Sequence, residues 1–236
     1  MAVVQPKFAV FDIDGTLMRW QLFHAIVHEL GKQGFLSVGA HEKIRSARFA
    51  WKNRLSKNGF ADYEAVLVEL YIEALQNLDA QEYRLIVDQV FSEYKDQTFT
   101  YTRDLAAKLK AQGYLLFAIS GSQQEIVERI GHHHGFDAAV GARLVMKNSA
   151  FTGEIVTPIH NKAAALQRLV DQYHCTYDES YGVGDSPSDS SMLDKVAHPI
   201  AFNPDQKLYD IAQDKGWQVV VERKNVVYEL PKPKAG

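Results

Sequence analysis

Cysteine is almost absent from this chain of 236 residues, since Cys175 is the only one. A single thiol excludes an internal disulfide framework. No apolar run reaches the length of about 20 residues that a membrane-spanning helix needs. The N-terminus also lacks a basic segment followed by a long apolar one, so we expect no signal peptide. The default expectation is a soluble cytoplasmic protein without a membrane partner.

Long basic runs are missing as well. The chain has 26 Lys and Arg against 29 Asp and Glu, a net charge of −3. This balance gives no electrostatic footprint for nucleic-acid binding, so we expect no nucleic-acid partner. Hydrophobic residues make up 46% of the chain and charged residues 23%, which is ordinary globular composition. The length allows one large domain or a domain with an insertion.

The most informative stretch lies close to the N-terminus. An apolar run at residues 8–11 leads directly into Asp12 and Asp14, and Gly15 and Thr16 then turn the chain. A short apolar run bounded by turn residues is typical of a buried strand in a parallel sheet. Ligand sites in open α/β sheets lie just outside the carboxyl ends of the strands. Chemistry is therefore expected at the two aspartates.

Two interpretations of Asp12 and Asp14 are open at this point. Neighbouring carboxylates repel each other and are costly to desolvate unless a cation compensates them. Mg²⁺ is the usual cation, because it binds one or two carboxylates together with phosphate oxygens of a substrate. The alternative is that both aspartates only stabilise a turn, which Asp does well.

The rest of the chain falls into a helical part and an alternating part. Residues 18–97 show apolar residues at helical spacing and no convincing strand, which indicates a small helical bundle. From Tyr101 onward, apolar strands alternate with helices. Strands are expected at 114–119, 181–183, 199–202 and 217–221, with short β-like pieces at 138–157. This alternation predicts an α/β fold with a doubly wound parallel sheet.

The domain boundaries follow from this division. Residues 1–17 and 98–236 are expected to form a Rossmann-like core, and residues 18–97 a helical domain inserted after the first strand. The Pro- and Lys-rich end, residues 230–236, is expected to fray.

A second motif, Ser120-Gly121-Ser122, follows the expected strand at 114–119 and opens a helix. A hydroxyl group and free backbone N–H groups at a helix N-terminus bind phosphate well. Serine is also a common helix N-cap, so this motif alone does not decide between the two roles.

Two further motifs lie at other predicted strand ends and helix starts. Lys162 stands at the start of a helix, where a cation is unfavourable with the helix dipole unless it faces an anion. Asp185 and Asp189 follow the strand at 181–183, and Pro187 can open the next helix. Asp185 would join Asp12 at a metal, and Asp189 could orient water or Lys162. The structural alternatives are a solvated lysine and a capped helix start.

These motifs together resemble the haloacid dehalogenase superfamily of phosphotransferases. The resemblance rests on Asp12-Ile13-Asp14-Gly15-Thr16, Ser120-Gly121-Ser122, Lys162, and Gly184-Asp185 with Asp189. It covers about residues 7–18 and 98–222, and the helical insert stands where the family places its type-1 cap. The order and sizes are most similar to the phosphoserine phosphatase-like subfamily.

The resemblance implies Mg²⁺-dependent hydrolysis of a small phosphomonoester through an aspartyl-phosphate. Asp12 would be the nucleophile, and Asp14 would protonate the leaving alkoxide and then activate water. Ser120, the Gly121 N–H group and Lys162 would hold the phosphoryl oxygens. In this scheme the metal ligands are Asp12, Asp14 and Asp185, with Asp189 supporting them.

The substrate is less constrained than the reaction. Phosphoserine phosphatases place an acidic residue shortly after the first motif, whereas the first acid here is Glu29. We expect Arg19, Trp20 and Gln21 to look into the pocket and to influence specificity. The same motifs also serve phosphotransferases and mutases, and a non-catalytic regulatory binding module on this fold is the third hypothesis.

Overall fold

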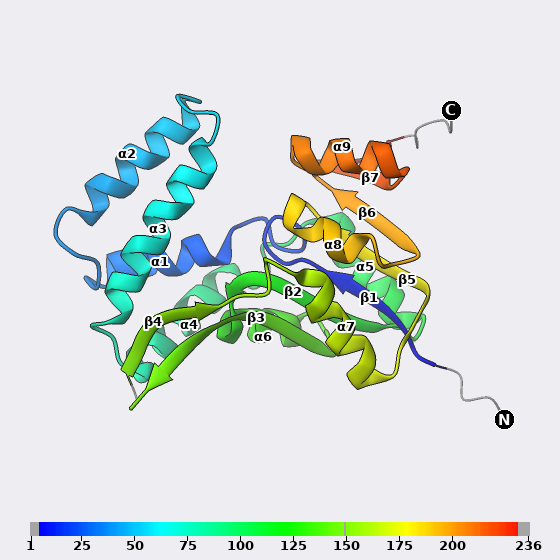
Figure 1. Ribbon diagram of the computed structural model, residues 1–236, viewed down its shortest axis with the longest axis horizontal. Helices are drawn as coiled ribbons and strands as arrows, with labels where there is room; N and C mark the ends of the chain where they lie inside the picture. The colour runs from blue at the N-terminus through cyan, green and yellow to red at the C-terminus, as the bar shows by residue number, and fades with distance from the viewer. Residues whose placement is uncertain (1–4, 149, 231–236) are drawn as a thin grey trace. The chain divides into compact units, whose positions relative to one another are not determined.

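The computed structural model describes residues 5–148 and 150–230 (Figure 1). The chain divides into two compact units. The first, here called the sheet unit, comprises residues up to Gln21, Tyr94–Ala142 and Thr157–Gly236. The second, the helical unit, comprises Leu22–Glu93 and Arg143–Val156. Residues 231–236 of the end that was expected to fray lie outside the described residues.

The sheet unit alternates strands and helices, as the sequence predicts. Its elements are β1 (Lys7–Phe11), α5 (Thr100–Ala111), β2 (Leu115–Gln123), α6 (Gln124–His133), the first part of β3 (Ala138–Lys147), α7 (Lys162–Tyr173), β5 (Thr176–Gly184), a 3₁₀ turn (Pro187–Asp189), α8 (Ser190–Leu193), β6 (His198–Phe202), α9 (Gln206–Lys215), β7 (Gln218–Arg223) and β8 (Val226–Leu230).

Strand β1 lies in the interior of the sheet. From β3 onward the strand order is β3-β2-β1-β5-β6-β7-β8, with parallel pairing up to β7 and an antiparallel β8 (Figure 1). The chain builds outward from β1 to β2 and β3 on one side, and then from β5 on the other side. The carboxyl end of β1 is therefore a topological switch point, where open α/β sheets bind ligands. The predicted α/β class with a mostly parallel sheet is confirmed.

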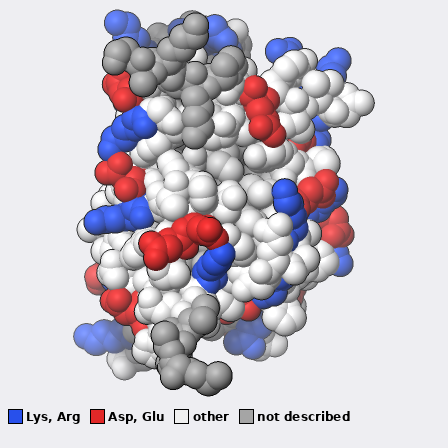
Figure 2. Space-filling model, turned by 90° about the vertical axis from the view of Figure 1, so that its right-hand side faces the viewer, with Lys and Arg blue, Asp and Glu red and all other residues white. Residues whose placement is uncertain are grey.

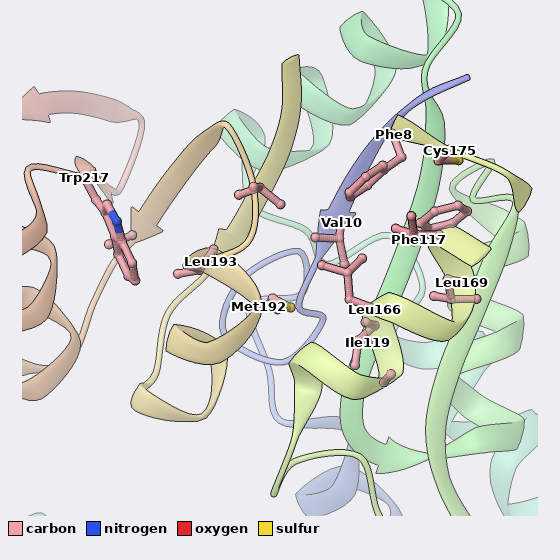
Figure 3. Close-up of a cluster of buried hydrophobic side chains, with 14 of the residues drawn as sticks. Phe8, Val10, Phe117, Ile119, Leu166, Leu169, Cys175, Met192, Leu193 and Trp217 are labelled. Carbon is pink, nitrogen blue, oxygen red and sulfur yellow. The ribbon is translucent and has the colours of Figure 1, made fainter. Parts of the chain in front are cut away.

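The side chains of β1 alternate between the two faces of the sheet, as those of a strand must. Phe8 and Val10 belong to a buried cluster with residues of α7, α8 and α9, and Phe8 stacks on Phe117 of β2 at a centroid distance of 5.7 Å (Figure 3). Phe11 points to the other face, where its ring meets Phe136 edge-on. Burial on both faces explains why this strand is a continuous apolar run. Cys175 is buried in the same cluster as Phe8.

The helical unit contains α1 (Leu22–Lys32), α2 (Ala40–Lys52), α3 (Gly59–Leu75), α4 (Ala80–Tyr94) and β4 (Ala150–Val156). Strand β4 pairs antiparallel with the second part of β3. The Tyr71 hydroxyl group donates a buried hydrogen bond to the Tyr83 hydroxyl oxygen, and the Tyr83 ring packs edge-on against Phe151 of β4. Aromatic contacts thus join the helices and the hairpin into one core.

This grouping differs from the boundaries expected from the sequence. The helical unit begins at Leu22 and ends its first segment at Glu93, where 18 and 97 were expected, and it includes residues 143–156, which were assigned to the core. Helix α9 and strand β8 were not expected at all. Among the described residues, no helix is both long enough and apolar enough to cross a bilayer.

Candidate active site

The sheet unit gathers the predicted motif residues at the carboxyl ends of β1, β2 and β5. Asp12 and Asp14 follow β1, and Ser120 lies near the end of β2. Lys162 is the first residue of α7, and the Asn161 side chain caps that helix by accepting a hydrogen bond from the Ala164 N–H group. An Asn N-cap is a recognisable helix start, so the position of Lys162 follows directly from the local sequence.

The Lys162 ammonium is the centre of the site. Its Nζ atom donates to Oδ1 of Asp12 at 2.5 Å and to Oδ1 of Asp189 at 2.6 Å. Lys162 is 1% exposed, Asp12 5% and Asp189 0%. Burial opposes the charged ammonium, but the carboxylates of Asp12 and Asp189 outweigh it and raise the pKa of Lys162. The lysine is therefore an ion-paired buried cation, and the interpretation as a solvated surface lysine is wrong.

Asp189 is fully engaged by the protein. Its second oxygen, Oδ2, accepts hydrogen bonds from the backbone N–H groups of Asp185 and Ser186 and from the Ser186 hydroxyl group. Ser186 and Asp189 form a capping box at the start of the 3₁₀ turn. The capped helix start and the support of Lys162 are thus two functions of one residue. Asp189 orients Lys162 from a rigid backbone turn.

The Asp12 carboxyl group is buried beside one ammonium and two further carboxylates. Burial raises its pKa to about 7, against the lowering effect of the Lys162 ammonium, and the carboxylates of Asp189 and Asp14 act in the same direction as burial. Burial, and then the charges of Asp12 and Asp189, also raise the pKa of Asp185 well above its ordinary value. In both groups burial is the largest cause of the pKa shift, and the neighbouring carboxylates add to it.

The charge balance of the site tests whether a metal ion fits there. Carboxylate oxygens of Asp12, Asp185 and Asp189 lie within 4.8 Å of one another, and this group is the one that could hold a metal among the described residues. Three carboxylates and the Lys162 ammonium leave a net charge of −2 when all are ionised. The oxygens are hard ligands, and a hard divalent cation is the ion that such a set accommodates.

Asp14 does not belong to this group of carboxylates. Its Oδ2 accepts a hydrogen bond of 2.6 Å from the Ser120 hydroxyl group, whose oxygen in turn accepts from the Ser122 N–H group. Ser120 was considered as a helix cap, but the N-cap of α6 is Gln123. Asp189, and not Asp14, supplies the third carboxylate of the group. The Asp14 carboxylate instead contacts Ser120 of the predicted phosphate-binding motif.

Two residues support the site without having been predicted for it. The Thr16 hydroxyl group donates to Oδ1 of Asp185 at 3.3 Å. Ile159 covers Gly121, since a Cβ atom on that glycine would lie 2.5 Å from Ile159 Cγ2. Thr16 could have been found in the first motif, whereas Ile159 stands in a loop without any pattern of its own. A side chain at position 121 would therefore collide with Ile159.

The three residues expected to govern specificity have different surroundings. The Arg19 guanidinium donates to the buried carboxylate of Glu222 at 2.9 Å and to the Thr98 carbonyl oxygen at 2.9 Å. These two hydrogen bonds tie the guanidinium to Glu222 and Thr98, and the role of Arg19 in specificity stays a prediction. Trp20 is 54% exposed and meets Tyr94 edge-on. Gln21 is half-buried.

Surface charge in the sheet unit is mixed. Figure 2 shows basic and acidic side chains interspersed on one face of the molecule, with no continuous basic area. Pairs such as Lys215 with Asp194 and Lys110 with Asp137 alternate the signs locally.

Comparison with known proteins now complements this geometry. A family model for haloacid dehalogenase-like hydrolases matches residues 9–194, a range that includes the residues of the site. The chain belongs to this family. The superfamily predicted from the motifs is therefore confirmed, and so is the prediction of a hydrolase.

Relatives of this haloacid dehalogenase-like chain are named as phosphatases. A probable phosphatase of Mycobacterium tuberculosis is 27% identical over 215 residues, covering 90% of this chain and 74% of that protein. A histidinol-phosphatase of Neisseria meningitidis is 26% identical over 223 residues, covering 91% and 98%. A solved structure of a phosphoserine phosphatase, described as a phospho-aspartyl intermediate analogue, has a TM-score of 0.64 at 20% identity and covers 94% of this chain and 95% of that one. The likeness to phosphoserine phosphatases is confirmed for the fold.

Proposed function

We propose that this chain is a Mg²⁺-dependent phosphomonoester hydrolase that works through an aspartyl-phosphate on Asp12. The observation that carries the proposal is the buried bridge from Lys162 to Asp12 and Asp189, next to the carboxylate of Asp185. A single ammonium among these carboxylates matches a centre that receives both a divalent cation and a phosphoryl group. The relatives named as phosphatases support the same conclusion.

Asp12 and Asp185 would hold the metal ion through carboxylate oxygens. Bound Mg²⁺ would neutralise phosphate charge and supply electrostatic stabilisation as that charge shifts. Both oxygens of Asp189 already accept hydrogen bonds within the protein, so its part is to fix Lys162. The Lys162 ammonium and the Gly121 N–H group would then orient the phosphoryl oxygens, while the Ser120 hydroxyl group donates to Asp14 and holds that carboxylate.

The first chemical step is an in-line displacement at phosphorus. An Asp12 carboxylate oxygen forms the new bond to phosphorus while the ester P–O bond breaks, and Asp14 delivers a proton to the leaving oxygen. In the second step Asp14 takes a proton from water, whose oxygen attacks the phosphorus and frees Asp12 with release of inorganic phosphate. The short hydrogen bond from Ser120 to Asp14 fixes the orientation of this acid and base.

The substrate class is a small phosphorylated metabolite. Phosphoserine is disfavoured within it, because no acid follows Asp14 closely and the carboxylate of Glu29 is already engaged by Lys32 and Gln33. The relatives make phosphoserine and histidinol phosphate the first esters to test, beside phosphosugars, nucleotides and an activated aryl phosphate.

Phosphate release with Mg²⁺ from this panel tests the proposal. Wild type is expected to turn over at least one ester, and Asp12→Asn to lose at least roughly a thousandfold, since removing a nucleophile leaves only binding and electrostatic effects. Asp194→Asn is the matched control, because Asp194 pairs with Lys215 at the surface.

No release from any ester, although Mg²⁺ binds, would count against a hydrolase. In that case, transfer of the phosphoryl group to an added sugar acceptor would identify a phosphotransferase or mutase. Absence of both reactions would leave the non-catalytic binding module.

A further inference from the structure

A second group of charged side chains lies in the helical unit, away from the carboxylate site in sequence. Helices α1 and α2 enclose an open groove of about 400 Å³. Five basic or titratable side chains line it, namely His28, His41, Arg45, Arg48 and Lys52. No Asp or Glu is among the described residues that line the groove. The groove therefore concentrates one sign of charge.

The pattern on α2 explains this concentration. His41, Arg45, Arg48 and Lys52 are separated by four, three and four positions, which places them along one face of a helix. His41 lies against α1 because that helix has a glycine at the contact: a Cβ atom on Gly31 would be 3.0 Å from His41 Cε1. The close approach brings the basic face of α2 beside His28 of α1.

Few of these charges are balanced by the protein. Arg45 pairs with Glu42 at 2.6 Å, one turn away on the same helix. Within the described part of the chain, no carboxylate forms an ion pair with Arg48 or Lys52, and the Lys52 ammonium lies 3.9 Å from the centre of the Trp51 ring. Lys43, on another face of α2, does have a partner in Glu69. Arg48 and Lys52 therefore line the groove without a carboxylate partner among the described residues.

The imidazole of His28 reflects the same excess. Burial lowers its pKa, and the positive charges of Arg48, His24, Lys32 and His41 lower it further. Like charges that crowd a groove repel one another, and an anion is the group that would relieve the repulsion.

We propose that this groove is a binding site for a small molecule that carries a dianionic phosphate or phosphonate group next to an apolar portion. The guanidinium of Arg48 provides the planar pair of donors that suits phosphate oxygens, and Lys52 provides a second cation. Ile44 and Phe49 give the groove an apolar wall, and Phe49 is 61% exposed there. Every lining residue of the groove belongs to the helical unit, whereas Asp12, Lys162 and Asp185 belong to the sheet unit.

The test uses the full chain without added metal and two probes, inorganic phosphate and phenylphosphonate. NMR signals of the histidine side chains report on the groove, because His28 and His41 line it. We expect both signals to shift in a saturable way, and phenylphosphonate to bind more tightly than inorganic phosphate. Backbone amides of Ser120 and Gly121 report separately on the carboxylate site.

Three variants each remove one positive charge, two of them inside the groove and one outside it. In Arg48→Gln, the Kd obtained from the His41 signal is expected to rise at least roughly tenfold, since the substitution removes charge-assisted hydrogen bonds. Lys52→Gln should give a smaller loss. Arg84→Gln, an exposed arginine of α4 that does not line the groove, should leave Kd unchanged.

Equal Kd values for Arg48→Gln and Arg84→Gln would overturn the proposal. So would shifts confined to Ser120 and Gly121, because the anions would then occupy only the carboxylate site. Neither outcome depends on turnover, so failure of the groove and failure of the proposed hydrolase remain separate results.

Discussion

The ion pairs around Lys162 in the sheet unit differ in burial from an ion pair on the surface of the helical unit. Around Lys162 in the sheet unit the paired side chains are 0–6% exposed. In the helical unit the pair of Lys43 with Glu69 is 58% and 65% exposed. In a buried ion pair neither side chain can replace its partner with water, so each is held in one position. Exposed ion pairs contribute only about 0–1 kcal/mol each to stability. Equal chemical changes should therefore have very different consequences in the two units.

The largest expected contrast comes from converting a carboxylate to an amide in each unit. Asp189→Asn removes the charge that holds Lys162, and breaking a buried pair costs about 3–5 kcal/mol in the free energy of unfolding. Hydrolysis should fall at least roughly a hundredfold, because Lys162 loses its second anchor. Glu69→Gln should change stability by less than about 1 kcal/mol. Urea unfolding and phosphate release measure both, and similar losses in the two variants would refute the contrast.

A pair of glycine substitutions separates backbone strain from damage to the site. Gly15 has φ +82°, and a Cβ atom there would overlap Oδ2 of Asp185. Gly113 has φ +85° with no atom within 4 Å of that position. Alanine at either position should cost about 1 kcal/mol of stability. Only Gly15→Ala should weaken Mg²⁺ binding, by roughly 10–100-fold, as measured by calorimetry; intact Mg²⁺ affinity would exclude a ligand role for Asp185.

The pH dependence of metal binding follows from the raised carboxyl pKa values. Asp12 has a pKa of about 7 in the fold against 3.8 ordinarily, so the folded protein holds a proton that the unfolded chain has released. Between these values, stability without metal should fall as pH rises. Mg²⁺ displaces that proton, so its stabilising effect should grow from about pH 6 to about pH 8.

Thermal unfolding with Mg²⁺ and with a chelator measures this dependence. The Mg²⁺-induced rise in Tm should be larger at the higher pH and should disappear in Asp185→Asn. A rise in Tm that does not depend on pH would contradict the assignment of Asp12 as a ligand.

The smallest effect is expected at Arg19. Because its guanidinium is paired with Glu222, Arg19→Gln should cost about 1 kcal/mol of stability and change KM by less than roughly twofold. Trp20→Ala provides the comparison on the neighbouring residue, which has no ion pair. A large rise in KM for Arg19→Gln alone would restore the original expectation that Arg19 contacts the substrate.

The sequence predicts the site better than it predicts the units. Asp12, Lys162 and Asp185 each stand at the end of a strand or the start of a helix, and parallel topology brings such positions together. The partner of Arg19 could not be predicted, because Glu222 lies 203 residues away and only the completed sheet brings the two together. A contact of Asp189 with Lys162 or with water, by contrast, was expected from the sequence, and the structure has Lys162 donating to Asp189.

The hairpin at 143–156 shows a different limit. Its strands have a largely exposed, alternating pattern that fits the edge of any sheet. Packing of Phe151 on Tyr83 decides that it belongs with the helices, and this contact spans a long stretch of chain. The local residue pattern cannot specify which distant residue the hairpin packs against. Helix α9 was overlooked although Asp205 caps it and Gly216 ends it, two features that the sequence does contain.

The central position of β1 also has a consequence for biosynthesis. The ribosome makes Asp12 150 residues before Lys162. At about 5–20 residues per second, the ribosome needs roughly 8 to 30 seconds to span that interval. During this time the carboxylates after β1 have neither their ammonium nor their neighbour strand β5. A nascent chain that stalls before α7 would therefore carry Asp12 but not Lys162, and the carboxylate site would stay incomplete until α7 and β5 had been made.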